Sequence, residues 1–282
     1  MERTAVSVGH RPGILLVGHG TRDANGTRQF FELGQQLASV ASQRFGPGAV
    51  VAPCLLEFQS PTIEEAWQEL EAKQVTDVIV VPLLLFSAGH AKSDIPDEVA
   101  KARQRFPIEG LNDVVWCRPI SRSSSMVELV RRRLGELRER TYVTDPQRVG
   151  IVMVGRGSRD PCATSDMKLL TEVALRGGES LQSQWSMSND AVFTTFYAMA
   201  QPRLPDTLAE IASSKRFDQV LVQPHLLFEG RLYDAIKRQV DQANCDHIET
   251  EFHLGDYLGP VDLVAEAVLS RLPSDANTFK TP

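Results

Sequence analysis

The chain has 282 residues, 42% hydrophobic and 23% charged, which is ordinary for a globular protein. Its net charge of −6 offers no basic field for nucleic acid, and no apolar run approaches the roughly 18 residues of a membrane span. The N-terminus shows no signal peptide and the four cysteines are scattered, so we expect a cytoplasmic protein with free thiols.

Strand and helix signals alternate along the first half. The predicted elements are strand 14–17, a helix with apolar residues at helical spacing from 30 to 41, strand 50–56, a helix after residue 62, strand 78–86, helix 94–106, strand 114–117 and helix 126–137. Thr62 and Glu65 form a capping-box pattern. The nine apolar residues of 78–86 are typical of a strand that is covered on both faces of a parallel sheet.

The last helix of this half carries several arginines, which we interpret as a solvated face. They are Arg131, Arg132, Arg133, Arg138 and Arg140.

The second half repeats this order of elements. Its predicted elements are strand 149–154, helix 164–175, strand 191–197, helix 206–214, strand 219–228, helix 232–243, strand 248–252 and helix 260–272. Repeated βα units predict an α/β fold with a parallel, doubly wound sheet in each half. The predicted domains are residues 12–140 and 148–273, joined by a linker around residues 140–148.

An internal duplication relates the two halves. ILLVGHGTRDANGTRQF at 14–30 matches IVMVGRGSRDPCATSDM at 151–167, with Arg156 in place of His19. VIVVPLLLFSAGH at 78–90 matches VLVQPHLLFEGRL at 220–232, with Leu232 opposite His90. Only the first half keeps histidines at these two positions, so we expect the functional site in the first half.

Three potential metal ligands follow three strands of the first half: His19, Glu57 and His90. Ligands of open α/β sheets bind beyond the carboxyl ends of the strands, where these side chains would meet. Glu57 interrupts an apolar run where a core residue is expected, and its predicted counterpart is Met199. Two imidazoles and a carboxylate suit Co²⁺, Fe²⁺, Ni²⁺ or Zn²⁺, although a solvated turn or a structural ion pair would also explain each residue alone.

Other residues have simpler interpretations. Asp23 and Asp160 occur in both copies and are expected to cap helices, and His225 is expected to be structural. A histidine phosphatase would need an arginine before the nucleophilic histidine, where Gly18 stands. A non-catalytic metal carrier stays open, and no P-loop motif occurs.

Taken together, the motifs resemble those of a known family. GHGTRD, LEFQSP and VPLLLFSAGHAKSDIP, followed by VGRGSRDP and QPHLLFEGRLYDAI, resemble the class II tetrapyrrole chelatases, most closely the sirohydrochlorin chelatases of the long CbiX and SirB type. The resemblance runs from about residue 13 to 272 and implies two flavodoxin-like domains that insert a divalent metal into sirohydrochlorin without ATP.

The resemblance also implies roles for individual residues. His19 and His90 would bind the metal, and Glu57 would be a ligand or a proton relay. Sirohydrochlorin carries eight carboxylates, for which Arg22, Lys92 and Arg156 are candidate partners by position.

Cobalt is the expected metal, as in cobalamin biosynthesis, and iron for sirohaem is the alternative. A non-catalytic carrier of metal or tetrapyrrole is a further alternative. No further cofactor is implied, because the chain lacks the histidine-rich tail and iron–sulfur motif of some long members. We expect a pseudo-symmetric monomer that binds neither nucleic acid nor membrane.

Overall fold

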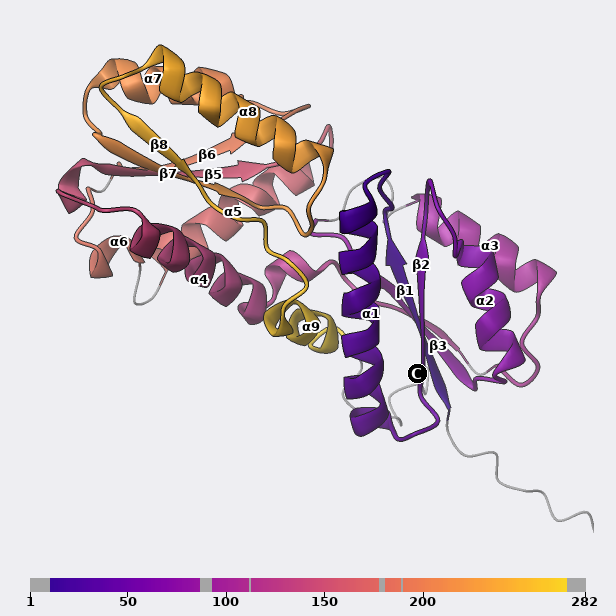
Figure 1. The fold of residues 1–282 in the computed structure, drawn as a ribbon. Coiled ribbons are helices and arrows are strands. Elements are labelled where there is room, and N and C mark those ends of the chain that lie inside the picture. The colour runs from indigo at the N-terminus through magenta and orange to yellow at the C-terminus, as the bar shows by residue number, and fades with distance from the viewer. Residues whose placement is uncertain (1–10, 87–92, 112, 178–180, 189, 273–282) are drawn as a thin grey trace, which may run out of the picture.

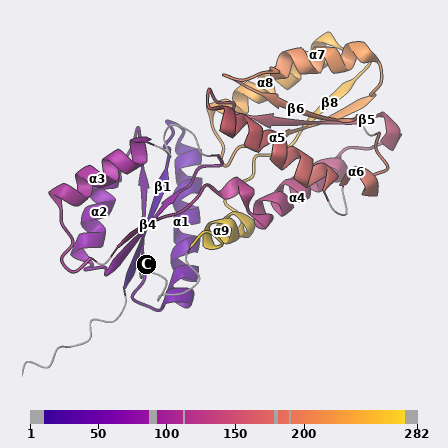
Figure 2. The ribbon, with the colours of Figure 1, turned by 180° about the vertical axis from the view of Figure 1, so that it is seen from behind.

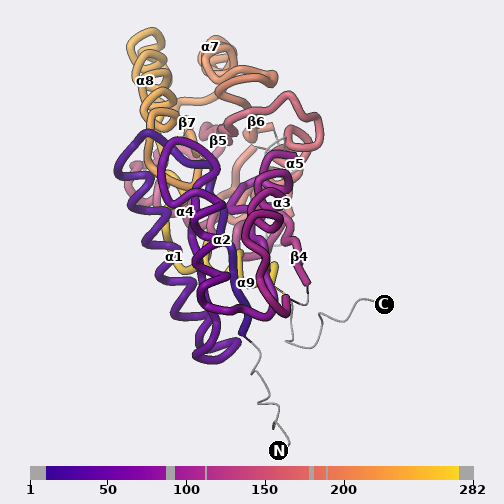
Figure 3. The backbone as a smooth tube through the Cα atoms, turned by 90° about the vertical axis from the view of Figure 1, so that its right-hand side faces the viewer, coloured from indigo at the N-terminus to yellow at the C-terminus, as the bar shows by residue number. Residues whose placement is uncertain are grey.

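Two four-stranded parallel sheets form the centre of the computed structural model, which describes residues 11–86, 93–111, 113–177, 181–188 and 190–272 (Figure 1). The first sheet has the order β2-β1-β3-β4 and the second has the order β6-β5-β7-β8. The predicted fold, two α/β domains related by duplication, is therefore confirmed. Seen from the side, α7 and α8 lie at the top of the molecule, with α1 and α2 below them (Figure 3).

The elements of the first half are β1 (Pro12–Gly18), α1 (Ala24–Phe45), β2 (Val50–Leu55), α2 (Ile63–Ala72), β3 (Asp77–Pro82), α3 (Ile95–Arg105), β4 (Val114–Trp116) and α4 (Ser124–Arg140). Those of the second half are β5 (Val149–Gly155), α5 (Pro161–Arg176), α6 (Leu181–Gln184), β6 (Val192–Phe196), α7 (Leu204–Ser214), β7 (Gln219–Pro224), α8 (Arg231–Asp246), β8 (Glu251–Leu254) and α9 (Asp262–Leu269). None of the helices within the described ranges is long and apolar enough to span a bilayer.

Local capping follows the sequence patterns. The Thr62 side chain accepts a hydrogen bond from the amide of Glu65, whose carboxylate accepts one from the Thr62 amide, so the predicted capping box is confirmed. Asp23 and Asp160 accept hydrogen bonds from the amides of Gly26 and Cys162, and both are N-caps as expected.

The third strand of each half is shorter than predicted. β3 ends at Pro82 and β7 at Pro224, whereas the sequence suggested strands that continue to 86 and 228. One further backbone hydrogen bond to the neighbouring strand follows each proline, from Leu83 to the Val17 carbonyl and from His225 to the Val154 carbonyl. The apolar residues beyond each proline leave the sheet and line a cleft between the two halves.

Two helices cross between the halves. α4 follows the first half in sequence, yet it packs against β7 and α5 of the second half. In exchange, α9 at the end of the second half packs against α1 and α4 (Figures 1 and 2). One continuous hydrophobic core therefore runs through both halves. The domain limits 12–140 and 148–273 follow the sequence repeat and stay a prediction for the folding units.

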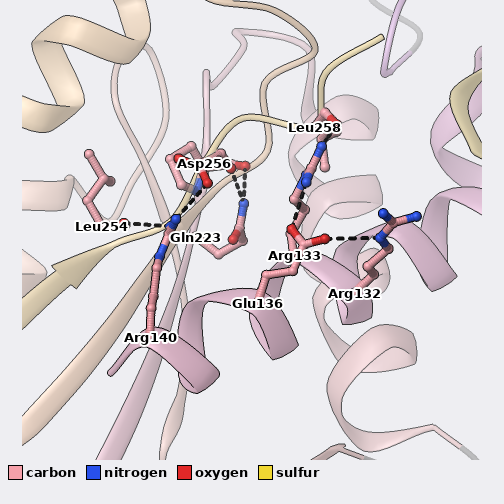
Figure 4. Close-up of polar contacts among 9 residues, drawn as sticks. Arg132, Arg133, Glu136, Arg140, Gln223, Leu254, Asp256 and Leu258 are labelled. Carbon is pink, nitrogen blue, oxygen red and sulfur yellow. Dashed lines mark hydrogen bonds and ion pairs between the residues drawn. The ribbon is translucent and has the colours of Figure 1, made fainter. Parts of the chain in front are cut away.

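The solvated-face interpretation of the α4 arginines is wrong for Arg131, Arg133 and Arg140, which contact distant segments, whereas Arg132 is exposed as expected. Arg133 donates to the Leu258 carbonyl at 2.7 Å, and Arg140 donates to the Asp256 carboxylate at 2.8 Å and to the Leu254 carbonyl (Figure 4). Arg131 donates to the carbonyls of Ala174 and Gly177 at the end of α5. The contacts of Arg133 and Arg140 hold the segment that carries the chain from β8 to α9, and those of Arg131 hold the end of α5.

Loss of one of these contacts should destabilise the whole fold. Arg133 is 15% exposed and Arg132, its neighbour, is 56% exposed and pairs only with Glu136 among the described residues. We expect Arg133→Met to lower the free energy of unfolding by about 2 kcal/mol, because a charged donor to a main-chain carbonyl is lost. Arg132→Met should cost less than about 0.5 kcal/mol.

Urea unfolding followed by circular dichroism measures both variants. Equal losses for the two substitutions would show that the contacts of Arg133 with the crossing segment contribute nothing to stability.

Candidate functional site

A large cleft of about 1220 Å³ lies between the two halves. Its walls are the segments that follow β1, β3, β5 and β7, so the carboxyl ends of both sheets open into the same space. The volume exceeds the roughly 300–1,000 Å³ of most small-molecule pockets. The cleft therefore suits a ligand larger than an ordinary metabolite.

Two equivalent turns place residues 19 and 156 at this cleft. Gly20 has φ +92°, and a Cβ there would lie 2.1 Å from the Glu57 carbonyl oxygen. Gly157 has φ +86°, and its Cβ would lie 1.7 Å from the Ala198 carbonyl oxygen. Only glycine fits at these two positions. The backbone of the turn is thus fixed in both halves, while the residue before each glycine can differ.

His19 is half-buried at the end of β1 and lines the cleft. Its Nδ1 lies 3.3 Å from the Gly20 carbonyl oxygen, a geometry that favours the tautomer with the proton on Nδ1. The lone pair is then on Nε2, as in histidines that bind metals through that atom. The position and tautomer of His19 fit the predicted role of a metal ligand.

Of the other predicted site residues, some line the cleft and some lie outside the described residues. Arg22 and Arg156 line the cleft, on opposite halves. His90 and Lys92 lie outside the described residues, so their predicted roles stay predictions. Within the described part of the chain, no cluster of three histidine, cysteine or acidic residues could hold a metal ion.

Glu57 does not stand at the core position that the sequence suggested. β2 ends at Leu55, and Glu57 is exposed in the turn that follows, where its amide donates to the His19 carbonyl at 3.0 Å. The amide of Ala198 donates to Arg156 in the same way, so the counterpart of Glu57 is Ala198 and not Met199. The Glu57 carboxylate is exposed to solvent, and the Glu57 main chain supports the turn at His19.

Some residues of the cleft were missed by the sequence reasoning. Arg159 and Arg231 add positive charge to the wall of the second half, and the aromatic ring of Phe58 lies beside His19. Arg159 could have been found, because the repeat pairs it with Arg22. Arg231, the first residue of α8, carried no such signal.

His225 forms the buried floor of the cleft. It is 1% exposed, its Nε2 lies 3.0 Å from Ser121 Oγ of the first half, and its ring packs 5.3 Å from that of Phe86. Burial lowers the pKa of His225 to about 3, so the ring is neutral at physiological pH. The contact with Ser121 joins the two halves, which agrees with the structural role expected of His225.

Comparison with known proteins identifies relatives over the whole chain. The family model CbiX matches twice, at residues 13–137 and 150–275. A sirohydrochlorin ferrochelatase of Priestia megaterium is 30% identical over 99% of this chain and 97% of its own, and a sirohydrochlorin cobaltochelatase of the same organism is 28% identical over 87% and 74%. The solved structure of SirB from Bacillus subtilis with Fe³⁺ superposes with a TM-score of 0.75 at 26% identity, covering 93% of this chain and 94% of that one.

The buried histidine should make the fold sensitive to acid. The unfolded chain takes up a proton at His225 near pH 6.5, whereas the folded chain does so only near pH 3. Stability is therefore lost as the pH falls below about 6.5, by about 2 kcal/mol at pH 5. His225→Leu, which copies Leu83 of the first half, should remove this loss.

Urea unfolding of both proteins at pH 7 and pH 5 measures the effect. If the two proteins lost the same free energy between these pH values, His225 would not be the acid-sensitive group.

Proposed function

Because the chain belongs to the CbiX family, we propose that it is a sirohydrochlorin chelatase, which inserts a divalent metal ion into the macrocycle without ATP. One observation carries the proposal: a single cleft of about 1220 Å³ has a strand-end histidine on one wall and arginines on both. The two halves of one chain already complete this cleft, so a pseudo-symmetric monomer is part of the proposal.

The arginines are proposed to bind the carboxylates of the substrate. Arg22 contributes from the first half, and Arg156, Arg159 and Arg231 from the second. A guanidinium group can hold a carboxylate through two parallel hydrogen bonds, which fixes orientation as well as position. Charges on both walls would hold the macrocycle across the cleft with its centre near His19.

His19 is proposed to deliver the metal together with His90. Each of the two pyrrole N–H groups must lose a proton when the metal enters, and a neutral imidazole can hold a metal or accept a proton near neutral pH. Glu57 is proposed as a relay that passes these protons to water. We favour a proton relay over a metal ligand for Glu57, because its carboxylate is exposed. Glu57 is also not among the described residues that line the cleft.

Cobalt is the proposed metal and iron is the second candidate. Sites with nitrogen donors bind Co²⁺ more tightly than Fe²⁺. Iron is favoured by the ferrochelatase relative that matches 99% of the chain.

A direct assay tests the proposal. Purified protein is mixed anaerobically with sirohydrochlorin and either Co²⁺ or Fe²⁺, and insertion is followed by the change in absorbance. We expect acceleration over the uncatalysed rate with both ions and a larger kcat/KM with Co²⁺. His19→Ala should lower kcat/KM at least about 100-fold, because a metal ligand and proton acceptor is lost.

His247→Ala is the matched control, since His247 follows α8 and does not line the cleft. This variant should keep the wild-type rate. Binding of the macrocycle without any acceleration by either ion would indicate a carrier, and normal turnover by His19→Ala would move the chemistry away from the β1 turn.

A further inference from the structure

Two exposed apolar side chains occupy the same place in the two halves. Phe58 and Met199 each follow the residue whose amide bonds to the turn at position 19 or 156. Phe58 is 52% exposed and Met199 is 48% exposed, and both line the cleft. The repeat thus presents one large apolar group to the cleft from each half.

Both residues have an unfavourable backbone conformation. Phe58 has φ 73° and Met199 has φ 59°, in the left-handed region where a side chain is strained and glycine is not. The neighbouring turns at residues 19 and 156, by contrast, have glycine at their own positive-φ positions, Gly20 and Gly157. Strained, exposed apolar side chains contribute little to the stability of the fold, so we interpret them as contacts for a ligand.

The surroundings of Phe58 indicate which ligand. Its ring is stacked against the His19 imidazole, with centroids 6.4 Å apart and planes at 24°, and the Arg22 guanidinium lies 5.1 Å from its centroid. An exposed aromatic side chain next to a cation and to the histidine that is proposed to bind the metal matches a flat macrocycle with an acidic rim. Met199 offers a polarizable thioether from the other half, a group that packs well on aromatic systems.

We propose that Phe58 and Met199 are positioning residues that contact the apolar ring system of the tetrapyrrole from the two halves. The inference rests on the proposed function and adds the contacts that hold the ring itself, where the arginines hold only its carboxylates. Phe58 sets the distance between the macrocycle and His19. Met199 prevents the macrocycle from shifting toward the second half.

Substitution by glycine separates ligand binding from folding. Phe58→Gly and Met199→Gly remove the side chain and also relieve the backbone strain. We expect Phe58→Gly to raise the Kd for metal-free sirohydrochlorin, measured by its fluorescence, about tenfold, and Met199→Gly about threefold. The double variant should raise it about 30-fold, and each melting temperature should stay within about 2 °C of wild type.

Leu169→Ala is the matched control, because Leu169 is 53% exposed on α5 but does not line the cleft. It should bind the macrocycle like wild type. Calorimetric binding of Co²⁺ alone should be unchanged in the glycine variants, since the proposal gives them no contact with the metal.

The possible outcomes separate the inference from the proposed function. Wild-type Kd values in both glycine variants would overturn the inference while leaving the chelatase proposal intact. A melting temperature that falls by several degrees would assign the two side chains to the fold and overturn the inference as well. Failure of the wild-type protein to bind sirohydrochlorin would overturn both proposals.

Discussion

The exchange of α4 and α9 between the halves is the constraint on which the cleft depends. Each helix covers apolar surface beside the sheet of the opposite half, so neither half completes its core alone. Arg133 and Arg140 fix the segment that makes the crossing, and the contact of His225 with Ser121 closes the floor. As a result the carboxyl ends of both sheets face one another across one space, and groups that lie far apart in sequence share it.

The two copies of the duplicated turn show which residues the backbone restricts and which it leaves free to vary. The glycines at 20 and 157 touch the carbonyl oxygens of the neighbouring turn, so the backbone is the same in both halves. The residue before each glycine has no such restriction, and it is histidine in one half and arginine in the other. The same turn can therefore serve a metal on one wall and an anionic substrate on the other.

The sequence predicted what depends on local patterns. Apolar periodicity located the strands and helices, Thr62 and Asp23 marked helix starts, and the repeat pointed to His19, which lines the cleft. Features that depend on contacts between distant segments were missed or misread. The arginines of α4 read as solvated because their carbonyl partners lie far away in the sequence, 43 residues for Arg131 and Ala174 and 125 residues for Arg133 and Leu258. The exposure of Glu57 depends on where β2 ends, which an apolar run does not reveal.

Both halves are proposed to bind one macrocycle in the shared cleft. Hydrogen–deuterium exchange of the full chain, with and without metal-free sirohydrochlorin, tests this without any metal chemistry. We expect slower exchange in both equivalent turns, residues 18–22 and 155–159, which line the cleft. Slower exchange in one turn alone, or in neither, would contradict it.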